Sequence, residues 1–223
     1  MKIIAHIRTD FTSKFGVPRQ SGLIDELEAT VVFEEPYRVA EAFRGLEEFS
    51  HIWLLWQFSQ AVRDTWSPTV RPPMLGGNTR VGVFATRSPF RPNAIGMSCV
   101  RLMAVEQTAE FGPVLRVRGA DLMDGTPIYD VKPYLPFADS RPDAVGGFAD
   151  RVEDRTVMVQ GEEKLAVLPP DKRDALLKVL ASDPRPTYQD DPERIYGFGF
   201  AGFEVRFTVS DRVLTVVSVE PTA

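Results

Sequence analysis

The sequence predicts a mainly β protein in which a closed or sandwiched β structure is followed by a smaller α+β unit. Two observations lead to this fold class. Short apolar segments separated by Pro- and Gly-rich turns run through residues 1–136, a pattern typical of β-barrels and β-sandwiches. These segments do not alternate with long helical patterns, as the strands of a parallel sheet would. The chain has 223 residues, 43% of them hydrophobic, so it is long enough to bury a large core.

Seven segments in the first part have the length and composition of strands. They are residues 3–7, 30–33, 52–58, 81–86, 97–105, 114–118 and 128–131. We expect one short helix among them, in the sequence YRVAEAFRGLEEF of residues 37–49. Phe43 and Leu46 approach helical spacing there, and Gly45 would end the helix.

The C-terminal part has a different pattern. Residues 137–155 lose apolar periodicity and contain a Gly pair, which predicts a linker. A helix is expected to begin at Pro169-Pro170-Asp171, with Asp171 as its cap and an apolar face of Leu176, Val179 and Leu180. Residues 203–209 alternate between apolar and polar, and residues 213–220 return as the second strand of an antiparallel hairpin. We therefore expect one domain over residues 1–140 and a second over residues 150–223.

The net charge of −5 argues against a protein that binds nucleic acid over its whole surface. The excess of acidic residues lies after residue 136, however, and residues 63–101 hold six arginines and a single acidic residue, Asp64. Such a positive strip suits a phosphate backbone. Pairing of these arginines with acidic residues elsewhere in the fold would explain them equally well.

The cysteine and histidine content excludes several kinds of site. One cysteine and two histidines leave no internal disulfide and no Cys/His metal cluster, so we expect no metal. Cys99 lies in the apolar run MSCVRLMAV, which favours a buried structural role over a nucleophilic one. The chain has no long apolar run, and its N-terminus meets charge too early for a signal peptide. These features predict a cytoplasmic protein without a membrane segment.

The stretch from Arg71 to Gly96, RPPMLGGNTRVGVFATRSPFRPNAIG, is the most informative in the chain. Its arginines carry planar guanidinium groups that suit phosphate or carboxylate. Its glycines allow a ligand to approach the backbone closely, and its prolines stiffen the turns. The stretch therefore predicts a system of binding loops. Neither the dinucleotide-binding glycine fingerprint nor a P-loop is present, so neither kind of nucleotide site is predicted.

A second polar segment, DLMDGTPIYDVKPY, covers residues 121–134. Asp124-Gly125-Thr126-Pro127 would be explained as a simple turn. A strand after this turn would place opposite charges side by side on one face, which favours a chemical role. The candidate catalytic residues are Asp121, Asp124, Asp130, Lys132 and Tyr134. Purely structural hydrogen bonding by the same side chains remains the alternative.

Five stretches of the chain carry a resemblance to a known family. They are FGVPRQSGL, FRGLEEFSHIWLLWQF, TVRPPMLGGNTRVGVFATRSPFRPNAIGMS, DLMDGTPIYDVKPYLPFADS and DPRPTY. On these motifs the sequence resembles the TrmO (YaeB/TsaA-like) family of tRNA methyltransferases over nearly its whole length. The resemblance implies a single-sheet β-barrel N-terminal domain, a smaller α+β C-terminal domain and a homodimer.

The resemblance also implies an activity and a methyl donor. A member of this family would transfer a methyl group from S-adenosyl-L-methionine to N6 of N6-threonylcarbamoyladenosine at position 37 of threonine-decoding tRNA. The cofactor-site positions that it implies are Pro18, Arg19, Gln20, Ser59, Gln60, Arg87, Arg91, Asn93, Leu102, Asp124, Gly125 and Thr126. The chain departs from the family pattern at Ala94, where a proline is usual, and at Ser59, where a histidine is common.

The chemistry of such a transfer defines what the protein must supply. The protein aligns the methyl donor with its acceptor and excludes water. The N6 atom is a poor nucleophile because its lone pair is delocalised into the purine and the ureido carbonyl. A carboxylate among Asp121, Asp124 and Asp130 would remove the N6 proton, and Lys132 or Tyr134 would stabilise the developing charge. Two alternatives remain: a methyltransferase with another acceptor, and a non-catalytic module that binds S-adenosylmethionine or RNA.

Contacts with tRNA are expected from the arginine strip and from exposed aromatic rings, with a loop base turned out of its stack as the target. Trp53 and Trp56 lie in the apolar run HIWLLWQF and are expected in the core. Trp66 and Tyr188 are the stacking candidates. The acidic second domain would contact tRNA only through a limited patch, at residues 185–188.

Overall fold

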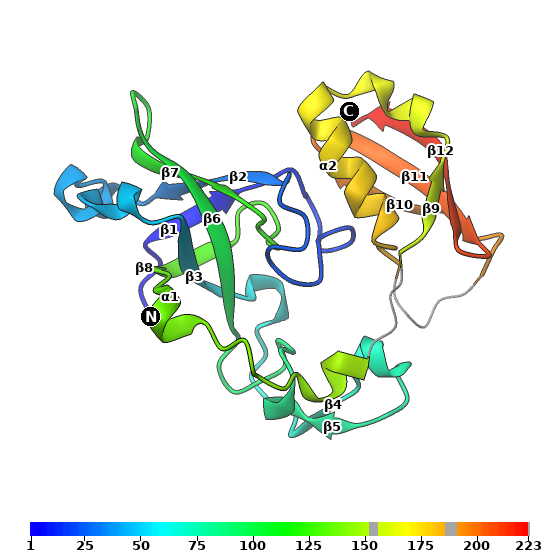
Figure 1. Cartoon of the computed structure of the whole chain (residues 1–223), viewed down its shortest axis with the longest axis horizontal. Helices are drawn as coiled ribbons and strands as arrows, with labels where there is room; N and C mark the ends of the chain where they lie inside the picture. The colour runs from blue at the N-terminus through cyan, green and yellow to red at the C-terminus, as the bar shows by residue number, and fades with distance from the viewer. Residues whose placement is uncertain (152–155, 186–190, 223) are drawn as a thin grey trace.

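The computed structural model describes residues 1–151, 156–185 and 191–222 (Figure 1). A closed six-stranded barrel forms the first part of the chain, and a four-stranded sheet with one long helix forms the second. The predicted fold class, a single-sheet β-barrel followed by a smaller α+β unit, is confirmed. Among the described residues, no helix has the length and apolar character needed to cross a membrane.

The barrel strands follow one another around the sheet, each antiparallel to its neighbours, and β8 closes the barrel on β1. Their order is β1 (Ala5–Arg8), β2 (Glu28–Phe33), β7 (Gly112–Arg118), β6 (Ile95–Thr108), β3 (His51–Gln57) and β8 (Pro127–Pro133). Every second residue points inward, so Ile52, Leu54 and Trp56 of β3 lie in the barrel core. The six predicted segments that correspond to these strands were therefore correct.

The prediction of a strand over residues 81–86 was wrong. Only Val81–Gly82 form a strand, β5, which pairs with β4 (Thr69–Val70) outside the barrel. A 3₁₀ turn, Val83–Ala85, follows at once. Val83 is buried whereas Phe84 is exposed, so one apolar anchor holds this segment and no regular strand is needed. Residues 59–92, which contain β4 and β5, form an arm beside the barrel (Figure 1), and further 3₁₀ turns lie within it at Ser59–Ala61 and Pro73–Leu75.

The prediction of a helix over residues 37–49 was also wrong. The segment forms three 3₁₀ turns, Glu35–Tyr37, Ala40–Phe43 and Leu46–Glu48. Gly45 separates the last two in a left-handed conformation, with φ of 85°. Phe43 is the buried residue of these turns and packs edge-on against Phe33 at 4.8 Å. A single anchored ring leaves no apolar stripe to stabilise a continuous α-helix.

The C-terminal unit (residues 156–222) contains a sheet with one face covered by α2 (Figure 1). Its strand order is β10 (Tyr196–Phe200), β11 (Phe203–Ser210), β12 (Val213–Pro221) and β9 (Met158–Gln160), with β9 parallel to β12. The hairpin predicted over residues 203–220 is confirmed. A 3₁₀ turn, Glu162–Val167, precedes the helix.

Helix α2 (Pro170–Ala181) buries the predicted apolar face. The predicted cap was wrong, because Pro169 occupies the N-cap position and Asp171 lies inside the first turn without a capping hydrogen bond. The predicted linker contains two short helical segments, α1 (Pro136–Asp139) and a 3₁₀ turn, Gly147–Arg151.

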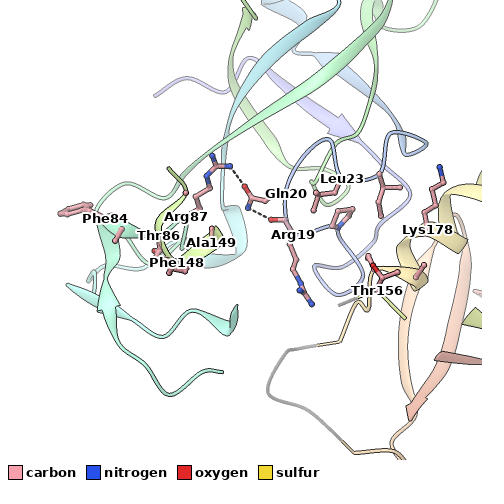
Figure 2. A pocket seen from close by; sticks show the side chains of 16 residues that line it. Arg19, Gln20, Leu23, Phe84, Thr86, Arg87, Phe148, Ala149, Thr156 and Lys178 are labelled. Carbon is pink, nitrogen blue, oxygen red and sulfur yellow. Dashed lines mark hydrogen bonds between the residues drawn. The ribbon is translucent and has the colours of Figure 1, made fainter. Parts of the chain in front are cut away.

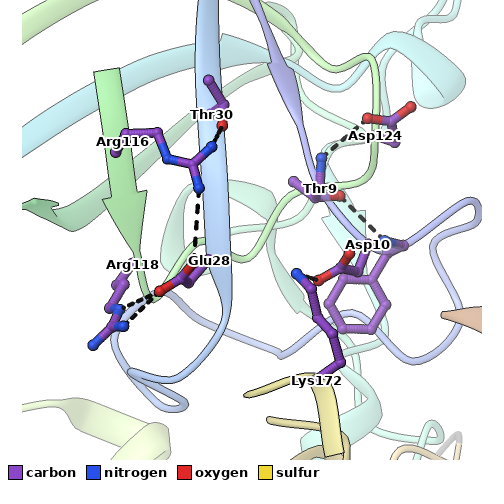
Figure 3. A network of polar contacts seen from close by, with 9 residues as sticks. Thr9, Asp10, Glu28, Thr30, Arg116, Arg118, Asp124 and Lys172 are labelled. Atoms are coloured by element: carbon purple, nitrogen blue, oxygen red, sulfur yellow. Dashed lines mark hydrogen bonds and ion pairs between the residues drawn. The ribbon is translucent and has the colours of Figure 1, made fainter. Parts of the chain in front are cut away.

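The β1–β2 segment (residues 9–27) joins the two parts of the molecule. Phe11, Ile24 and Leu27 are buried in the core of the C-terminal unit rather than in the barrel. Phe11 forms a β-bridge with Phe200, and the two rings pack edge-on at 5.2 Å. Beside them the Lys172 ammonium lies 2.6 Å from the Asp10 carboxylate (Figure 3). The core of the C-terminal unit is therefore completed by residues that follow the first barrel strand.

We expect Phe11→Ala to destabilise the protein by about 3–5 kcal/mol, the usual cost of emptying a buried phenylalanine site. Phe11 is 2% exposed and fills the space beside Phe198 and Phe200. Urea unfolding followed by fluorescence measures the change in the free energy of unfolding. Phe137→Ala is the matched control, because Phe137 is 86% exposed and its loss leaves no cavity. An equal effect of the two substitutions would show that Phe11 does not hold the units together.

Candidate functional site

Two neighbouring cavities lie where the barrel, the arm and the C-terminal unit meet. The interdomain cavity has a volume of about 1070 Å³ and is lined by the β1–β2 segment, residues 84–87, residues 146–149 and the end of α2 (Figure 2). The barrel-end cavity has a volume of about 300 Å³ and is lined by residues 56–61, Pro89, Phe90 and residues 121–123. Pro18 lines both cavities. A ligand in one cavity therefore lies next to a ligand in the other.

A chain of buried and half-buried polar groups runs along the wall of the barrel-end cavity. Trp56 Nε1 donates a hydrogen bond to Ser98 Oγ at 2.9 Å, and Ser98 Oγ donates to Asp121 Oδ1 at 2.5 Å. Ser98 is 0% exposed, so its hydroxyl is fully committed to these two partners. Burial raises the pKa of Asp121, while the Ser98 hydrogen bond and the positive charge of Arg87 act in the opposite direction. The wall thus carries one carboxylate that holds its proton more firmly than an exposed aspartate does.

The Trp56 ring needs a glycine opposite it. A Cβ atom at Gly96 would overlap the six-membered ring of Trp56. The glycine at the end of RPNAIG therefore lets the indole lie flat on β6, and its Nε1 can then reach Ser98. This contact gives a structural reason for one residue of the longest motif.

The predicted loop Pro18-Arg19-Gln20 is fixed from both sides. Arg19 Nη2 donates to the backbone oxygen of Asp183 at 3.1 Å, and Gln20 Oε1 accepts a hydrogen bond from Arg87 (Figure 2). Asp183 is buried, has φ of 50°, and binds Arg185 through both carboxylate oxygens at 2.9 and 3.0 Å. The beginning of the motif DPRPTY therefore forms a rigid turn that holds Arg19. The rest of the motif, including Tyr188 and most of the predicted patch 185–188, lies outside the described residues.

The six arginines of the positive strip have different surroundings. Among the described residues only Arg101 forms an ion pair, with Asp25 at 3.4 Å. Arg91 donates to the backbone oxygens of Thr86 and Ser88, and so braces its own loop. The Arg63 guanidinium lies 4.0 Å from the centre of the Phe90 ring. Pairing with acidic residues elsewhere is therefore not the general explanation for this strip.

The predicted cofactor-site residues divide into three groups by position. Pro18, Ser59, Gln60 and Thr126 line the barrel-end cavity. Arg19, Gln20 and Arg87 line the interdomain cavity. The remaining positions lie outside both linings, and they are Arg91, Asn93, Leu102, Asp124 and Gly125.

Of these outer positions, Asp124 and Gly125 shape the turn before β8. Asp124 Oδ1 accepts from the Thr9 backbone at 3.0 Å (Figure 3), and Gly125, with φ of 74°, donates from its backbone to Ile7. Leu102 is buried in the barrel core, and Asn93 is exposed.

The predicted catalytic residues do not all lie at one site. Asp121 faces the barrel-end cavity, whereas Asp130 and Lys132 form an ion pair of 2.9 Å on the outer face of β8. Tyr134 packs beside Trp53, with ring centres 5.9 Å apart. The expected contact of opposite charges along this strand exists, but among the described residues it lies apart from the two cavities.

Two burial predictions need correction. Trp53 lies on the outer face of β3 and donates to Asp139 at 3.1 Å, so its placement in the core was wrong. Trp53 and Trp56 are an odd number of residues apart on one strand, and such residues point to opposite faces. Cys99 is half-buried on the outer face of β6 instead of lying in the core. Burial nevertheless raises the pKa of its thiol, which disfavours the reactive thiolate.

Sequence reasoning missed several residues at the site. Ser98 is the last residue of the motif of residues 69–98 but was not predicted as a site residue, and Phe84 was assigned to a strand. Phe148 and Lys178 lie far from the other motifs and join the interdomain cavity only through the fold. Among the described residues, no cluster of three or more His, Cys, Asp or Glu side chains is suited to a metal ion.

Comparison with known proteins gives a consistent result. The family model of the tRNA-methyltransferase O N-terminal domain matches residues 6–140, and that of the TrmO C-terminal domain matches residues 155–222. The chain is 44% identical over 227 residues to a tRNA (adenine(37)-N6)-methyltransferase of Escherichia coli, covering 98% of this chain and 96% of the relative.

Two further relatives come from Pseudomonas aeruginosa. One, whose name is that of an S-adenosylmethionine-dependent methyltransferase, is 43% identical and covers 87% of this chain and 85% of its own length. A crystal structure of TrmO from the same species superposes with a TM-score of 0.76 at 34% identity, covering 98% of this chain and 95% of that one. The fold, the family models and the relatives agree, and the chain belongs to the tRNA-methyltransferase O (TrmO) family.

Proposed function

We propose that this protein transfers a methyl group from S-adenosylmethionine to N6 of N6-threonylcarbamoyladenosine at position 37 of threonine-decoding tRNA. The names of its relatives support the reaction class and the donor. The observation that carries the proposal is the Asp121 carboxylate, which faces a cavity also lined by Pro18, Ser59 and Gln60.

We assign the methyl donor to the barrel-end cavity. Its volume of about 300 Å³ lies at the lower end of the range for small-molecule sites. The rings of Trp56, Phe58 and Phe90 line it, and aromatic faces attract a positively charged sulfonium group. Gln60 and Thr126 add polar groups that orient a ligand. When bound, S-adenosylmethionine supplies an electrophilic methyl group on this sulfur.

The protein's own part in the reaction is alignment and removal of a proton. As the new N6–methyl bond forms and the sulfur–methyl bond breaks, the N6 proton must leave. Asp121 Oδ2 is the group that we propose to accept it, because Oδ1 is held by Ser98. A raised pKa makes the carboxylate a better proton acceptor than an ordinary aspartate, provided that it is ionised.

The other predicted catalytic residues receive different roles in this proposal. Asp124 holds the turn before β8 through Thr9. Asp130, Lys132 and Tyr134 belong to the outer face of the barrel. We further propose a homodimer, because Met97 and Met103 expose apolar surface on the outer face of β6. Light scattering in solution, which gives the mass of the particle, tests this.

The reaction is tested with radiolabelled S-adenosylmethionine and two preparations of threonine tRNA, with and without the threonylcarbamoyl group. We expect label only in the modified tRNA. Label in both would place the acceptor elsewhere on the RNA. Binding of the donor without labelling of either tRNA would favour a non-catalytic module.

We expect Asp121→Asn to lower kcat by about 10²–10⁴-fold at saturating donor, the usual contribution of a positioned general base. The amide keeps the shape and the hydrogen bond from Ser98 but cannot accept the proton. Single-turnover methylation measures the loss, and Glu106→Gln, which changes an exposed carboxylate of β6, is the control. A greater loss in Asp130→Asn than in Asp121→Asn would move the base to the outer face of β8.

Ser98→Ala should shift the acidic limb of the pH–kcat profile to higher pH. The Ser98 hydrogen bond favours the ionised carboxylate, so its loss raises the pKa of Asp121 further. Activity that requires ionised Asp121 then appears only at higher pH, and it recovers as the pH is raised. The profile of kcat from pH 5 to 9 measures the shift. An unshifted profile with a uniformly lower kcat would show that Ser98 acts only through packing.

A further inference from the structure

The interdomain cavity is larger than the methyl donor requires, and its lining has the chemistry of an RNA site. We propose that it holds the single-stranded anticodon-loop nucleotides that flank the methylated adenosine. The inference rests on the proposed function and adds the place where the RNA is held.

The charges around the cavity are one-sided. Arg19, Arg87 and Lys178 line it, and its described lining includes no acidic residue, in a chain whose net charge is −5. Lys178 binds Glu26, which lies outside the lining. An ammonium group has three N–H donors, so this contact leaves Lys178 able to bind a phosphate as well. The cavity is thus a local cationic site on an acidic protein, and such sites attract phosphates.

The arm supplies aromatic surface at the same place. Phe84 lines the cavity, is 71% exposed and stacks on Trp66, which is 48% exposed, with ring centres 5.9 Å apart. Phe148 lies on the same side of the cavity as Phe84, across from Arg19 and Lys178 (Figure 2). The exposed Phe84 ring and the half-buried Phe148 ring, across from cationic groups, suit single-stranded nucleic acid, with bases on the rings and phosphates on the cations.

The position of the cavity explains how one base reaches the donor. Pro18 lines both the interdomain cavity and the barrel-end cavity. A loop that rests in the larger cavity can turn one adenosine past Pro18 toward Asp121, while its neighbours remain stacked on the arm. The end of α2 supplies the opposite wall, and among the described residues the acidic C-terminal unit would contact RNA there through Lys178.

Equilibrium binding of the full-length protein to a threonylcarbamoylated anticodon stem-loop tests the proposal. We expect Phe84→Ala and Phe148→Ala each to weaken binding about 5- to 150-fold, the effect of losing one stacked base. The Km for RNA should rise by a similar factor, while kcat at saturating RNA and the Kd for S-adenosylmethionine stay near those of the unaltered protein. Phe137→Ala removes an exposed ring on α1 that does not line the cavity, and it should change none of these values.

The cationic side is tested with Lys178→Met. We expect the slope of log Kd against log salt for RNA to fall by about 0.7, the value for one contact with a single-strand phosphate. Glu26→Gln breaks the same ion pair but keeps the lysine, so it should leave the slope unchanged. An equal change in both variants would show that the ion pair matters only for packing, and would overturn the role of Lys178.

The two proposals fail in different ways. If the unaltered protein methylates modified tRNA while Phe84→Ala and Phe148→Ala bind RNA with unchanged affinity, the RNA site lies elsewhere and the proposed function stands. If the unaltered protein binds the stem-loop with the expected sensitivity to these substitutions but transfers no methyl group, the RNA site stands and the proposed reaction is wrong.

Discussion

The packing of the β1–β2 segment into the C-terminal unit is the constraint on which the rest of the site depends. Phe11 and Ile24 are buried on either side of Pro18-Arg19-Gln20, in a core that belongs to the C-terminal unit. The loop between these anchors is therefore held by that unit at its ends and by the Asp183 backbone at Arg19. Because Pro18 lines both cavities, this packing helps to shape both. The C-terminal unit shapes the site even though the barrel supplies the carboxylate.

The sequence predicted the barrel strands better than the segments that fold outside the barrel. Period-two alternation defines a barrel strand locally, so the strand at residues 52–58 was found almost to the residue. The arm and residues 37–49 fold around single anchors, Val83 and Phe43, and one buried side chain leaves no periodic signal. The alternation along a strand also shows that Trp53 and Trp56, an odd number of residues apart, cannot both point into the barrel.

For the site, the sequence predicted residue types better than positions. Asp121 and Asp130 lie in one motif and have the same chemistry. In the barrel, however, Asp121 lies on the wall of a cavity and Asp130 lies on the outer face of β8. Ser98 is the last residue of the longest motif and Lys178 lies in none, and each is tied to the site by a contact with a residue 23 or 152 positions away in the chain. Such long-range pairs are set by strand order and by the docking of the two units, which local patterns do not record.

The half-buried Asp121 carboxylate lowers the stability of the folded protein at neutral pH. The pKa of Asp121 is higher in the folded state than the ordinary value for an aspartate, so between these two values the folded protein binds more protons than the unfolded chain. The free energy of unfolding then falls as the pH rises through this window, and at neutral pH the ionised carboxylate costs stability. Ser98 and Arg87 reduce that cost without removing it. A fold selected for stability alone would place an uncharged side chain here, and the aspartate that stands beside Trp56 and Ser98 instead is the residue that we propose to accept the N6 proton.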